Sequence, residues 1–245
     1  MPCPLLPTKI VWGLDFYSTG LKTLVFIYIW CMNQFLVSVS GMFEAEGFHP
    51  SGATGLDFRE LEGTCCYCSE EAAEIFSKAL KEPEGIAWID SGDYHYLSYF
   101  RAKRIKQDFE LILLDNHSDD FDLCGLLSCG NWVTALQEQS GCRVSLIRGI
   151  RDYDPASPSP LPVFISLDLD VLREEEFITN WDQGTMTTEE LETILGAIAG
   201  SRKVLGMDIC GGLSVSKGAD GSALRSNRER RERLCSFLRE ISLLQ

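Results

Sequence analysis

Two short apolar segments of the sequence each end in acidic and imidazole side chains at alternating positions. Asp115, His117 and Asp119 follow the first segment, and Asp168 and Asp170 follow the second. Alternate side chains of an extended chain point the same way, so the members of each cluster converge on one side. Buried carboxylates need a counter-charge, and metal cations supply one. The sequence therefore predicts a metal site built from these five residues.

The charge of the two clusters indicates how many ions the site holds. Their four aspartates carry −4, which two divalent cations would balance. Mixed oxygen and imidazole ligands suit manganese best, with iron, zinc, cobalt and nickel as alternatives. Two such ions about 3.5–4 Å apart share a water and lower its pKa, which generates hydroxide near neutral pH.

A third apolar segment, residues 85–90, is followed closely by His95. The chain contains only three histidines, His49, His95 and His117. His95 lies just past the end of this segment, so we expect it to be a sixth ligand. The alternative is a histidine that is hydrogen-bonded in a polar pocket. His49 lies in a loop-like stretch and receives no role.

Segments that are apolar almost throughout are typical of parallel strands covered on both faces. The expected strands are residues 85–90, 109–115, 142–149, 163–168 and 203–209. Helix signals lie between them, with Ser69 as an N-cap, a capping box at Thr187 and Glu190, and an apolar stripe over residues 234–244. Residues 214–227 are polar and are expected to form a surface loop. The alternation predicts an α/β fold with a mainly parallel sheet, and the length of 245 residues suits a single domain.

The N-terminal stretch allows two interpretations. Residues 24–43 are apolar enough to suggest a membrane segment or a signal anchor. Asn33 and Gln34 interrupt this stretch, and residues 25–30 are rich in β-branched and aromatic side chains. A core strand is therefore favoured over a membrane segment. We expect residues 1–20 to be poorly ordered.

Charge and cysteine content restrict the class of protein. The net charge is 22 − 36 = −14, which repels phosphate backbones, so a nucleic-acid partner is not expected. Most of the ten cysteines lie in apolar segments, which favours reduced thiols in a cytoplasmic protein. Cys65 and Cys68 form one C-x-x-C pair. A zinc ribbon would also need Cys124 and Cys129, whose spacing fits no standard module.

The order of these motifs resembles that of the ureohydrolase family of arginases and agmatinases. The resemblance rests on D-x-H-x-D from Asp115 to Asp119, on S-x-D-x-D from Ser166 to Asp170, and on an upstream Gly-Asp-x-His segment that ends at His95. It implies a three-layer α/β/α sandwich and two manganese ions. It also implies a small-molecule substrate, and homo-oligomers are common in the family. A metal-bridging hydroxide would attack the planar carbon of a guanidine, amidine or amide.

The same resemblance implies roles for single residues. The metal ligands would be His95, Asp115, His117, Asp119, Asp168 and Asp170. Asp115 and Asp168 would bridge the two ions. Asp119 would also be the catalytic residue that moves a proton to the leaving amine.

The sequence departs from the family pattern around the substrate. Glycine follows Cys210 where the family has a glutamate that grips the guanidinium, and residues 128–132 lack the histidine expected there. The pocket would therefore be rebuilt, and its expected substrate-binding residues are Asn131, Trp132, Trp181 and Asp182, with Cys210 nearby. Asp182 would replace the missing glutamate as an anion for a cationic substrate. Each of these side chains has packing as its alternative role.

The leading interpretation is a binuclear metal-dependent hydrolase of non-peptide C–N bonds, from a divergent branch of this family. A deacetylase-like enzyme with a single zinc ion is the first alternative, because deacetylases share the broad fold and a D-x-H pair. The second alternative is a non-catalytic metal-binding relic, since the substrate residues of the family are missing.

Overall fold

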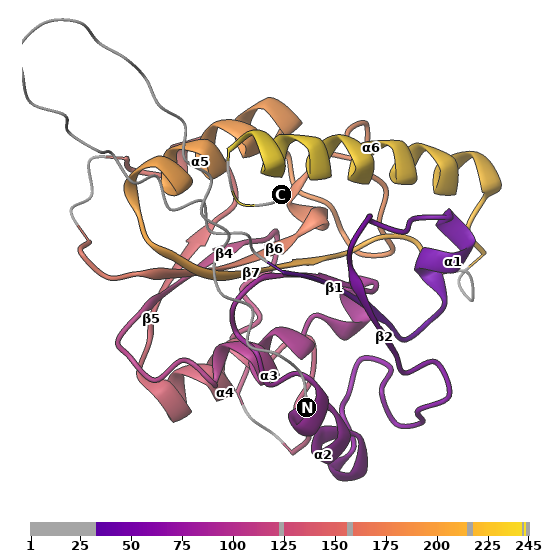
Figure 1. Ribbon diagram of the computed structural model, residues 1–245, viewed down its shortest axis with the longest axis horizontal. Helices are drawn as coiled ribbons and strands as arrows, with labels where there is room; N and C mark the ends of the chain where they lie inside the picture. Colours follow the sequence, from indigo (N-terminus) through magenta and orange to yellow (C-terminus); the bar gives the residue numbers. More distant parts are fainter. Residues whose placement is uncertain (1–32, 123–124, 156–158, 215–217, 242, 244–245) are drawn as a thin grey trace, which may run out of the picture.

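Helices cover both faces of one parallel sheet in the computed structural model, which describes residues 33–122, 125–155, 159–214, 218–241 and 243 (Figure 1). The strands are β1 (Gln34–Ser38), β2 (Thr54–Asp57), β3 (Ile86–Ile89), β4 (Glu110–Leu114), β5 (Arg143–Ile147), β6 (Val163–Asp168) and β7 (Val204–Cys210). The α-helices are α1 (Met42–Glu46), α2 (Glu70–Ala79), α3 (Leu97–Ala102), α4 (Trp132–Ser140), α5 (Thr188–Ser201) and α6 (Gly221–Glu240). Short 3-10 turns are η1 (Gly92–Tyr94), η2 (Ile150–Asp152) and η3 (Leu169–Val171).

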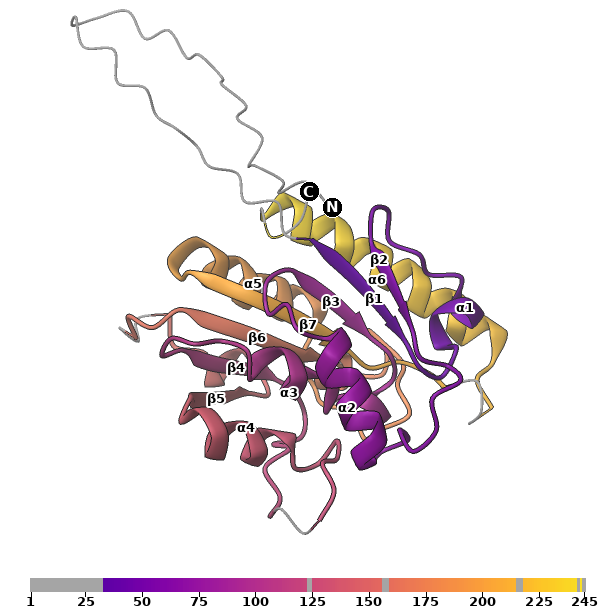
Figure 2. The same cartoon turned by 60° about the horizontal axis from the view of Figure 1, so that its bottom comes forward.

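The seven strands lie in the order β2-β1-β3-β7-β6-β4-β5, and every neighbouring pair is parallel (Figure 2). Helices α5 and α6 lie on one face, and α2, α3 and α4 lie on the other. The predicted mainly parallel sheet and the three-layer α/β/α architecture are confirmed. The single domain over residues 1–245 stays a prediction, because part of that range lies outside the described residues.

The sequence of β4 shows why its strand is apolar from Leu111 to Leu114. Ile112 and Leu114 pack in the core beneath α5 and α6, whereas Leu111 and Leu113 pack in the core beneath α2, α3 and α4. Side chains alternate between the faces of a strand, so a sheet covered on both faces needs apolar residues at every position. The five residues of β4 are all buried.

The predicted helix starts at Ser69 and Thr187 are confirmed. The Ser69 hydroxyl accepts a hydrogen bond from the backbone N–H of Ala72, and Thr187 and Glu190 form the expected capping box. The predicted surface loop over residues 214–227 is wrong from Gly221 onward, where α6 begins.

The early start of α6 has a physical cause in its polar residues. Asp220 caps the helix by accepting from the backbone N–H of Ser222. Asn227 and Arg231 are fully buried, and Arg231 pairs with the buried Glu46 at 2.8 Å. Because buried polar side chains such as Asn227, rather than an apolar stripe, hold the first half of the helix, this half has no hydrophobic periodicity in the sequence.

The stretch 24–43 lies partly within the described residues. Its second half forms β1 and α1, and β1 pairs with β2 and β3 inside the sheet. The expected strand over residues 25–30 and the expected disorder of residues 1–20 lie outside the described residues. None of the helices in the described part is long and apolar enough to cross a bilayer.

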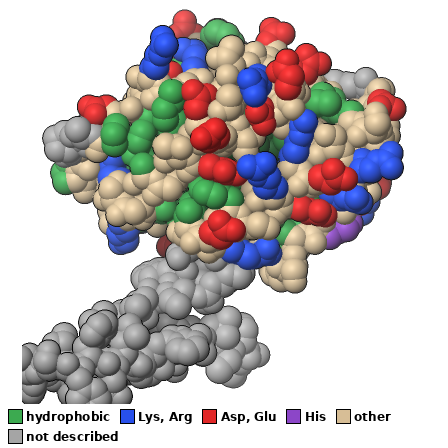
Figure 3. All heavy atoms as spheres, turned by 90° about the horizontal axis from the view of Figure 1, so that it is seen from above, with side chains coloured by type: hydrophobic (Ala, Val, Ile, Leu, Met, Phe, Trp, Pro, Cys, Tyr) green, Lys and Arg blue, Asp and Glu red, His purple; other side chains and the backbone are tan. Residues whose placement is uncertain are grey.

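The cysteines and surface charges add two observations. The seven described cysteines are free thiols. Acidic and basic side chains are interspersed over the face that α5 and α6 form, with no patch of a single sign (Figure 3).

Candidate metal centre

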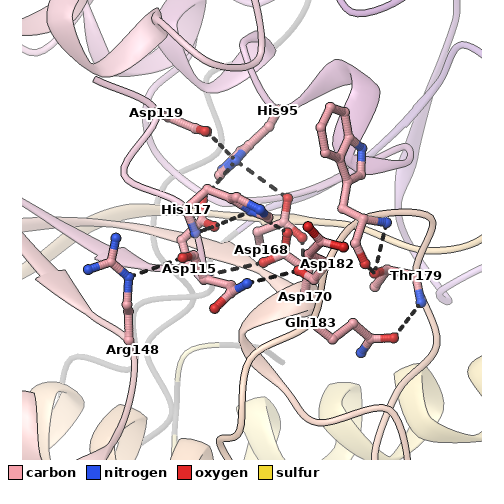
Figure 4. A network of polar contacts seen from close by, with 12 residues as sticks. His95, Asp115, His117, Asp119, Arg148, Asp168, Asp170, Thr179, Asp182 and Gln183 are labelled. Carbon is pink, nitrogen blue, oxygen red and sulfur yellow. Dashed lines mark hydrogen bonds and ion pairs between the residues drawn. The ribbon is translucent and has the colours of Figure 1, made fainter. Parts of the chain in front are cut away.

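The carboxyl ends of β3, β4 and β6 bring the predicted ligands together (Figure 4). β4 pairs directly with β6, so Asp115 just after β4 lies beside Asp168, which ends β6. His95 follows β3 through the turn η1. Ligand sites at the carboxyl ends of strands are common in open α/β sheets. The structure thus gathers His95, Asp115, His117, Asp119, Asp168 and Asp170 at one sheet edge.

The His95 ring turns one nitrogen toward three carboxylates. Its Nδ1 lies 3.3 Å from Asp115 Oδ2, 3.0 Å from Asp119 Oδ2 and 3.5 Å from Asp168 Oδ2. Its Nε2 lies 2.8 Å from the hydroxyl of Ser166. The pKa of His95 is raised well above its usual value, because the carboxylates outweigh the burial that opposes the charge. The ring is therefore oriented with Nδ1 toward the place where a cation would bind.

His117 forms the second imidazole contact. Its Nδ1 lies 2.9 Å from Asp170 Oδ2 and 3.6 Å from Asp115 Oδ1, and its backbone N–H donates to Asp115 Oδ1 at 2.7 Å. Hydrogen bonds that the ring donates to Asp115 and Asp170 raise its pKa to about 10. In this arrangement a proton on His117 occupies the position that a cation would take.

Two groups of ligand atoms share Asp115. One consists of His95, Asp115 and Asp168 and the other of Asp115, His117 and Asp170, each with its atoms within 4.8 Å of one another. Asp115 Oδ2 is buried, and its contact with His95 Nδ1 at 3.3 Å lacks good hydrogen-bond geometry. A buried carboxylate oxygen without a partner is costly unless a cation satisfies it.

The carboxylates also show the need for positive charge. Burial raises the pKa of Asp168 well above its usual value, and burial raises the pKa of Asp170 to about 6. Both acids therefore resist ionisation in this setting, as expected for crowded carboxylates without enough cations. The donor set and the unsatisfied oxygen of Asp115 fit a pair of divalent metal ions.

Asp119 is held by an unusual backbone conformation and by an indole. Its φ is 48°, in the left-handed region, and its carbonyl accepts from the backbone N–H of Val133 at 3.1 Å. The Trp132 Nε1–H donates to Asp119 Oδ2 at 2.7 Å. Burial raises the pKa of Asp119. The carboxylate is thus fixed beside His95 by contacts from the start of α4.

The site opens into a cavity of about 500 Å³. Its walls include the predicted ligands His95, Asp115, His117, Asp119, Asp168 and Asp170 together with Cys66, Tyr67, Gly92, Asn116, Ser118, Phe121, Ser128, Cys129, Gly130, Arg148 and Trp181. Tyr67, Phe121 and Trp181 are 60%, 73% and 37% exposed. Exposed aromatic side chains grouped around a polar site are typical of ligand-binding clefts.

The expected substrate residues have different positions. Trp181 lines the cavity, and its ring lies 6.0 Å from that of His117. Trp132 is fully buried behind Asp119. Asn131 is buried, and its side-chain oxygen accepts from the backbone N–H of Ser128 at 2.8 Å. Asp182 is exposed and is not among the lining residues.

The neighbouring Cys210 is also turned away from the cavity. It is fully buried, and its thiol lies 3.4 Å from the carbonyl of Asp90 and 3.3 Å from that of Ser91. Burial raises its pKa well above the usual value. Its position indicates a packing role at the junction of β3 and β7.

Sequence reasoning overlooked several lining or supporting residues. Ser166 belongs to the S-x-D-x-D motif but had no role, and it holds the His95 ring. Arg148 directly follows β5, so the rule that residues after parallel strands meet at one edge would have found it. Tyr67 and Phe121 lie in loops and carry no spacing signal.

Comparison with known structures identifies the fold. The chain matches a hypothetical agmatinase from Burkholderia thailandensis with a TM-score of 0.60, at 10% identity and over 85% of this chain and 86% of that one. It matches formimidoylglutamase from Bacillus subtilis with a TM-score of 0.59, at 12% identity and over 94% and 95% of the two chains. The chain has the arginase fold.

A further solved structure agrees with this assignment, and one curated protein is similar in sequence. Proclavaminate amidino hydrolase from Streptomyces clavuligerus has a TM-score of 0.59, at 12% identity over 87% of this chain and 93% of that chain. An uncharacterized protein from Thermotoga maritima is 27% identical over 191 residues, which are 72% of this chain and 78% of that protein. No protein-family model matches the chain.

A glycine lies against the candidate metal centre. Gly211 follows β7 with φ 102°, and a Cβ placed on it would lie 2.5 Å from Asp168 Oδ1. Only glycine fits this close approach without displacing the carboxylate. The glycine where a guanidinium-binding glutamate was expected thus lies against a predicted metal ligand.

Proposed function

We propose that this protein is a hydrolase of non-peptide C–N bonds that uses two divalent metal ions, with manganese as the best-suited metal. The observation that carries the proposal is the pair of ligand groups that share Asp115. Solved structures of the same fold are named agmatinase, formimidoylglutamase and proclavaminate amidino hydrolase. These names support an amidine, guanidine or amide as the substrate.

The proposed ligand sets follow the two groups. His95 and Asp119 would bind one ion, His117 and Asp170 would bind the other, and Asp115 would contact both. Asp168 would complete the first set from β6. When bound, the two cations would polarise the substrate and lower the pKa of a water molecule.

The residues of the chain would then orient the reactants and move protons. Water adds to the planar carbon, the C–N bond breaks, and the nitrogen leaves as an amine that has gained a proton. Asp119 would carry that proton, because it lines the cavity beside the other proposed ligands. Trp132 holds Asp119, and Ser166 keeps the His95 ring in place.

Metal content and turnover together test this proposal. We expect about two manganese ions per chain by elemental analysis of the reconstituted protein, and release of an amine from guanidino, amidino or amide compounds. His117→Ala should lower the stoichiometry to about one, and Asp115→Asn should weaken both sites. Asp120→Asn is the matched control, since this exposed neighbour lies outside both groups.

The alternatives give different results in the same experiment. One tightly bound zinc ion in the wild type would favour a deacetylase-like enzyme. Two bound metals without turnover of any of these compounds would favour the non-catalytic relic. Both results would contradict the proposed hydrolase.

A further inference from the structure

The cavity contains a basic side chain that the proposed metal chemistry does not use. Arg148 directly follows β5, and among the described residues that line the cavity it is the one lysine or arginine. Its Nε–H donates to the carbonyl of Asn116 at 3.0 Å. Asn116 lies between the ligands Asp115 and His117, so this bond ties the guanidinium to the metal centre.

The two Nη nitrogens of the Arg148 guanidinium are available to bind a ligand. Within the described part of the chain, no carboxylate forms an ion pair with Arg148, and no hydrogen bond engages its Nη1 or Nη2. The nearby Asp152 instead accepts from the backbone N–H groups of Arg148 and Gly149, at 2.9 and 3.1 Å. A guanidinium with two unused nitrogens offers the paired donors that bind a carboxylate in bidentate fashion.

The charge of the cavity wall favours an anionic ligand. Asp115, Asp119, Asp168 and Asp170 contribute −4, and two bound dications would contribute +4, so the metal centre itself would be neutral. Arg148 is then the one charged side chain of the described wall outside the proposed ligand set. Asp182, the anion expected to attract a cationic substrate, is not part of this wall.

The aromatic side chains that line the cavity indicate the chemistry of the middle part of the ligand. Tyr67, Phe121 and Trp181 line the cavity, and they are three of the five large hydrophobic side chains that are exposed in the described part of the chain. They suit a carbon skeleton that joins the reactive group to a charged end.

We infer that the substrate carries a carboxylate, which Arg148 binds, joined by an apolar spacer to the C–N bond that is cleaved. This inference rests on the proposed hydrolase function. It predicts that this enzyme selects substrates with an acidic tail and rejects those with a basic tail.

Two compounds that share a guanidine group but end in opposite charges test which charge the cavity prefers. 4-Guanidinobutyrate ends in a carboxylate, and agmatine has nearly the same length and ends in an ammonium group. Isothermal titration calorimetry on the manganese-loaded protein gives the affinity for each, and amine release gives turnover. We expect 4-guanidinobutyrate to bind about 10-fold or more tightly than agmatine, as for a charge-assisted hydrogen bond.

Variants then assign the preference to one side chain. Arg148→Gln should remove the difference between the probes, and Arg148→Glu should reverse it. Arg151→Gln is the matched control, because this exposed arginine is three residues away and does not line the cavity. Melting temperature and manganese content should match those of the wild type in all three variants.

The outcomes separate this inference from the proposed function. Turnover with a preference for agmatine, or with a preference that Arg148→Gln leaves intact, overturns the carboxylate site but keeps the hydrolase. Binding of 4-guanidinobutyrate that depends on Arg148, without turnover, supports the carboxylate site and counts against hydrolysis of guanidines. If neither probe binds, the inference is overturned.

Discussion

The indole of Trp132 and the carboxylate of Asp119 are joined by a hydrogen bond of 2.7 Å beneath the metal centre. Asp119 comes from the loop after β4, whereas Trp132 is the first residue of α4. The Trp132 ring also lies 5.0 Å from the His95 ring. A single buried tryptophan therefore positions two of the proposed ligands, which is a different role from the substrate contact expected from sequence.

Trp132→Phe should weaken the metal centre without unfolding the protein. The substitution keeps an aromatic ring against His95 but removes the donor to Asp119. A hydrogen bond to a charged group contributes about 1.5–3 kcal/mol, so we expect turnover to fall by about 10-fold to 100-fold. Manganese affinity should fall as well, and both quantities can be measured on the purified variant.

Trp88→Phe is the matched control for that substitution. Trp88 is also fully buried, and its indole donates to Gln34 at 3.2 Å. This variant loses an indole hydrogen bond to a neutral amide away from the site, so its melting temperature should fall while its manganese affinity stays unchanged. Equal losses of affinity in both variants would show that Trp132 acts through general stability alone.

Metal binding should release protons and become tighter as the pH rises. Asp115 and Asp170 raise the pKa of His117 to about 10, so the metal-free site holds a proton at neutral pH. A histidine ligand must be neutral, and the proton leaves when the metal enters. Calorimetric titration with manganese in buffers of different ionisation enthalpy measures the number released. His117→Asn should release fewer protons than the wild type.

The same raised pKa predicts a pH dependence of the metal-free fold. The bound proton stabilises the folded state fully below pH 6.5, the usual pKa of histidine. That stabilisation is lost as the pH rises through about 10. Thermal denaturation of the chelated protein between these limits should show a declining melting temperature, and His117→Asn should flatten the decline.

The sequence predicted which residues gather at this end of the sheet because their signal is local. Asp115, His117, Asp168 and Asp170 follow apolar strands at a spacing of two, and parallel strands place such residues at one edge. The structure gathers these residues together with His95. The intervening Tyr94 belongs to the turn η1, which delivers the His95 ring to the same edge.

The cavity walls could not be predicted in the same way. Tyr67 and Phe121 are exposed loop residues, and loops have no periodicity that indicates where a side chain points. Trp132 and Asn131 were expected to contact substrate because they lie near a strand end. Their burial depends on how α4 packs against the sheet, which is a tertiary property. The first half of α6 was missed for the related reason that its buried contacts are polar, such as those of Asn227.

Glu110→Gln should destabilise the protein in a pH-dependent way. Glu110 begins β4, where it accepts from Arg202 at 2.8 Å and from the Ser145 hydroxyl at 2.6 Å. Its pKa lies below the usual 4.5, because these hydrogen bonds outweigh the burial that would raise it. The stabilisation is therefore present above pH 4.5 and is lost as the pH falls through the lowered pKa.

Urea denaturation at pH 7 and at low pH checks this prediction for Glu110. We expect the variant to lose about 1–3 kcal/mol at pH 7 and to approach the wild type in acid. Glu74→Gln provides the comparison, since the Glu74–Lys78 pair is highly exposed and such surface pairs contribute about 0–1 kcal/mol. The prediction would be contradicted if the free energy of unfolding of the wild type fell in acid no more steeply than that of Glu110→Gln.

Gly211→Ala should damage the metal centre more than the fold. The new Cβ would lie 2.5 Å from Asp168 Oδ1 and 3.0 Å from the backbone nitrogen of Leu169, so the Asp168 carboxylate must move. Gly52→Ala is the matched control, because Gly52 also has a positive φ, of 80°, but has no atom within 4 Å of its Cβ position. Both substitutions strain the backbone by about 1 kcal/mol. Only Gly211→Ala should lower manganese affinity. Equal manganese affinities of the two variants would show that the position of the Asp168 carboxylate does not affect metal binding.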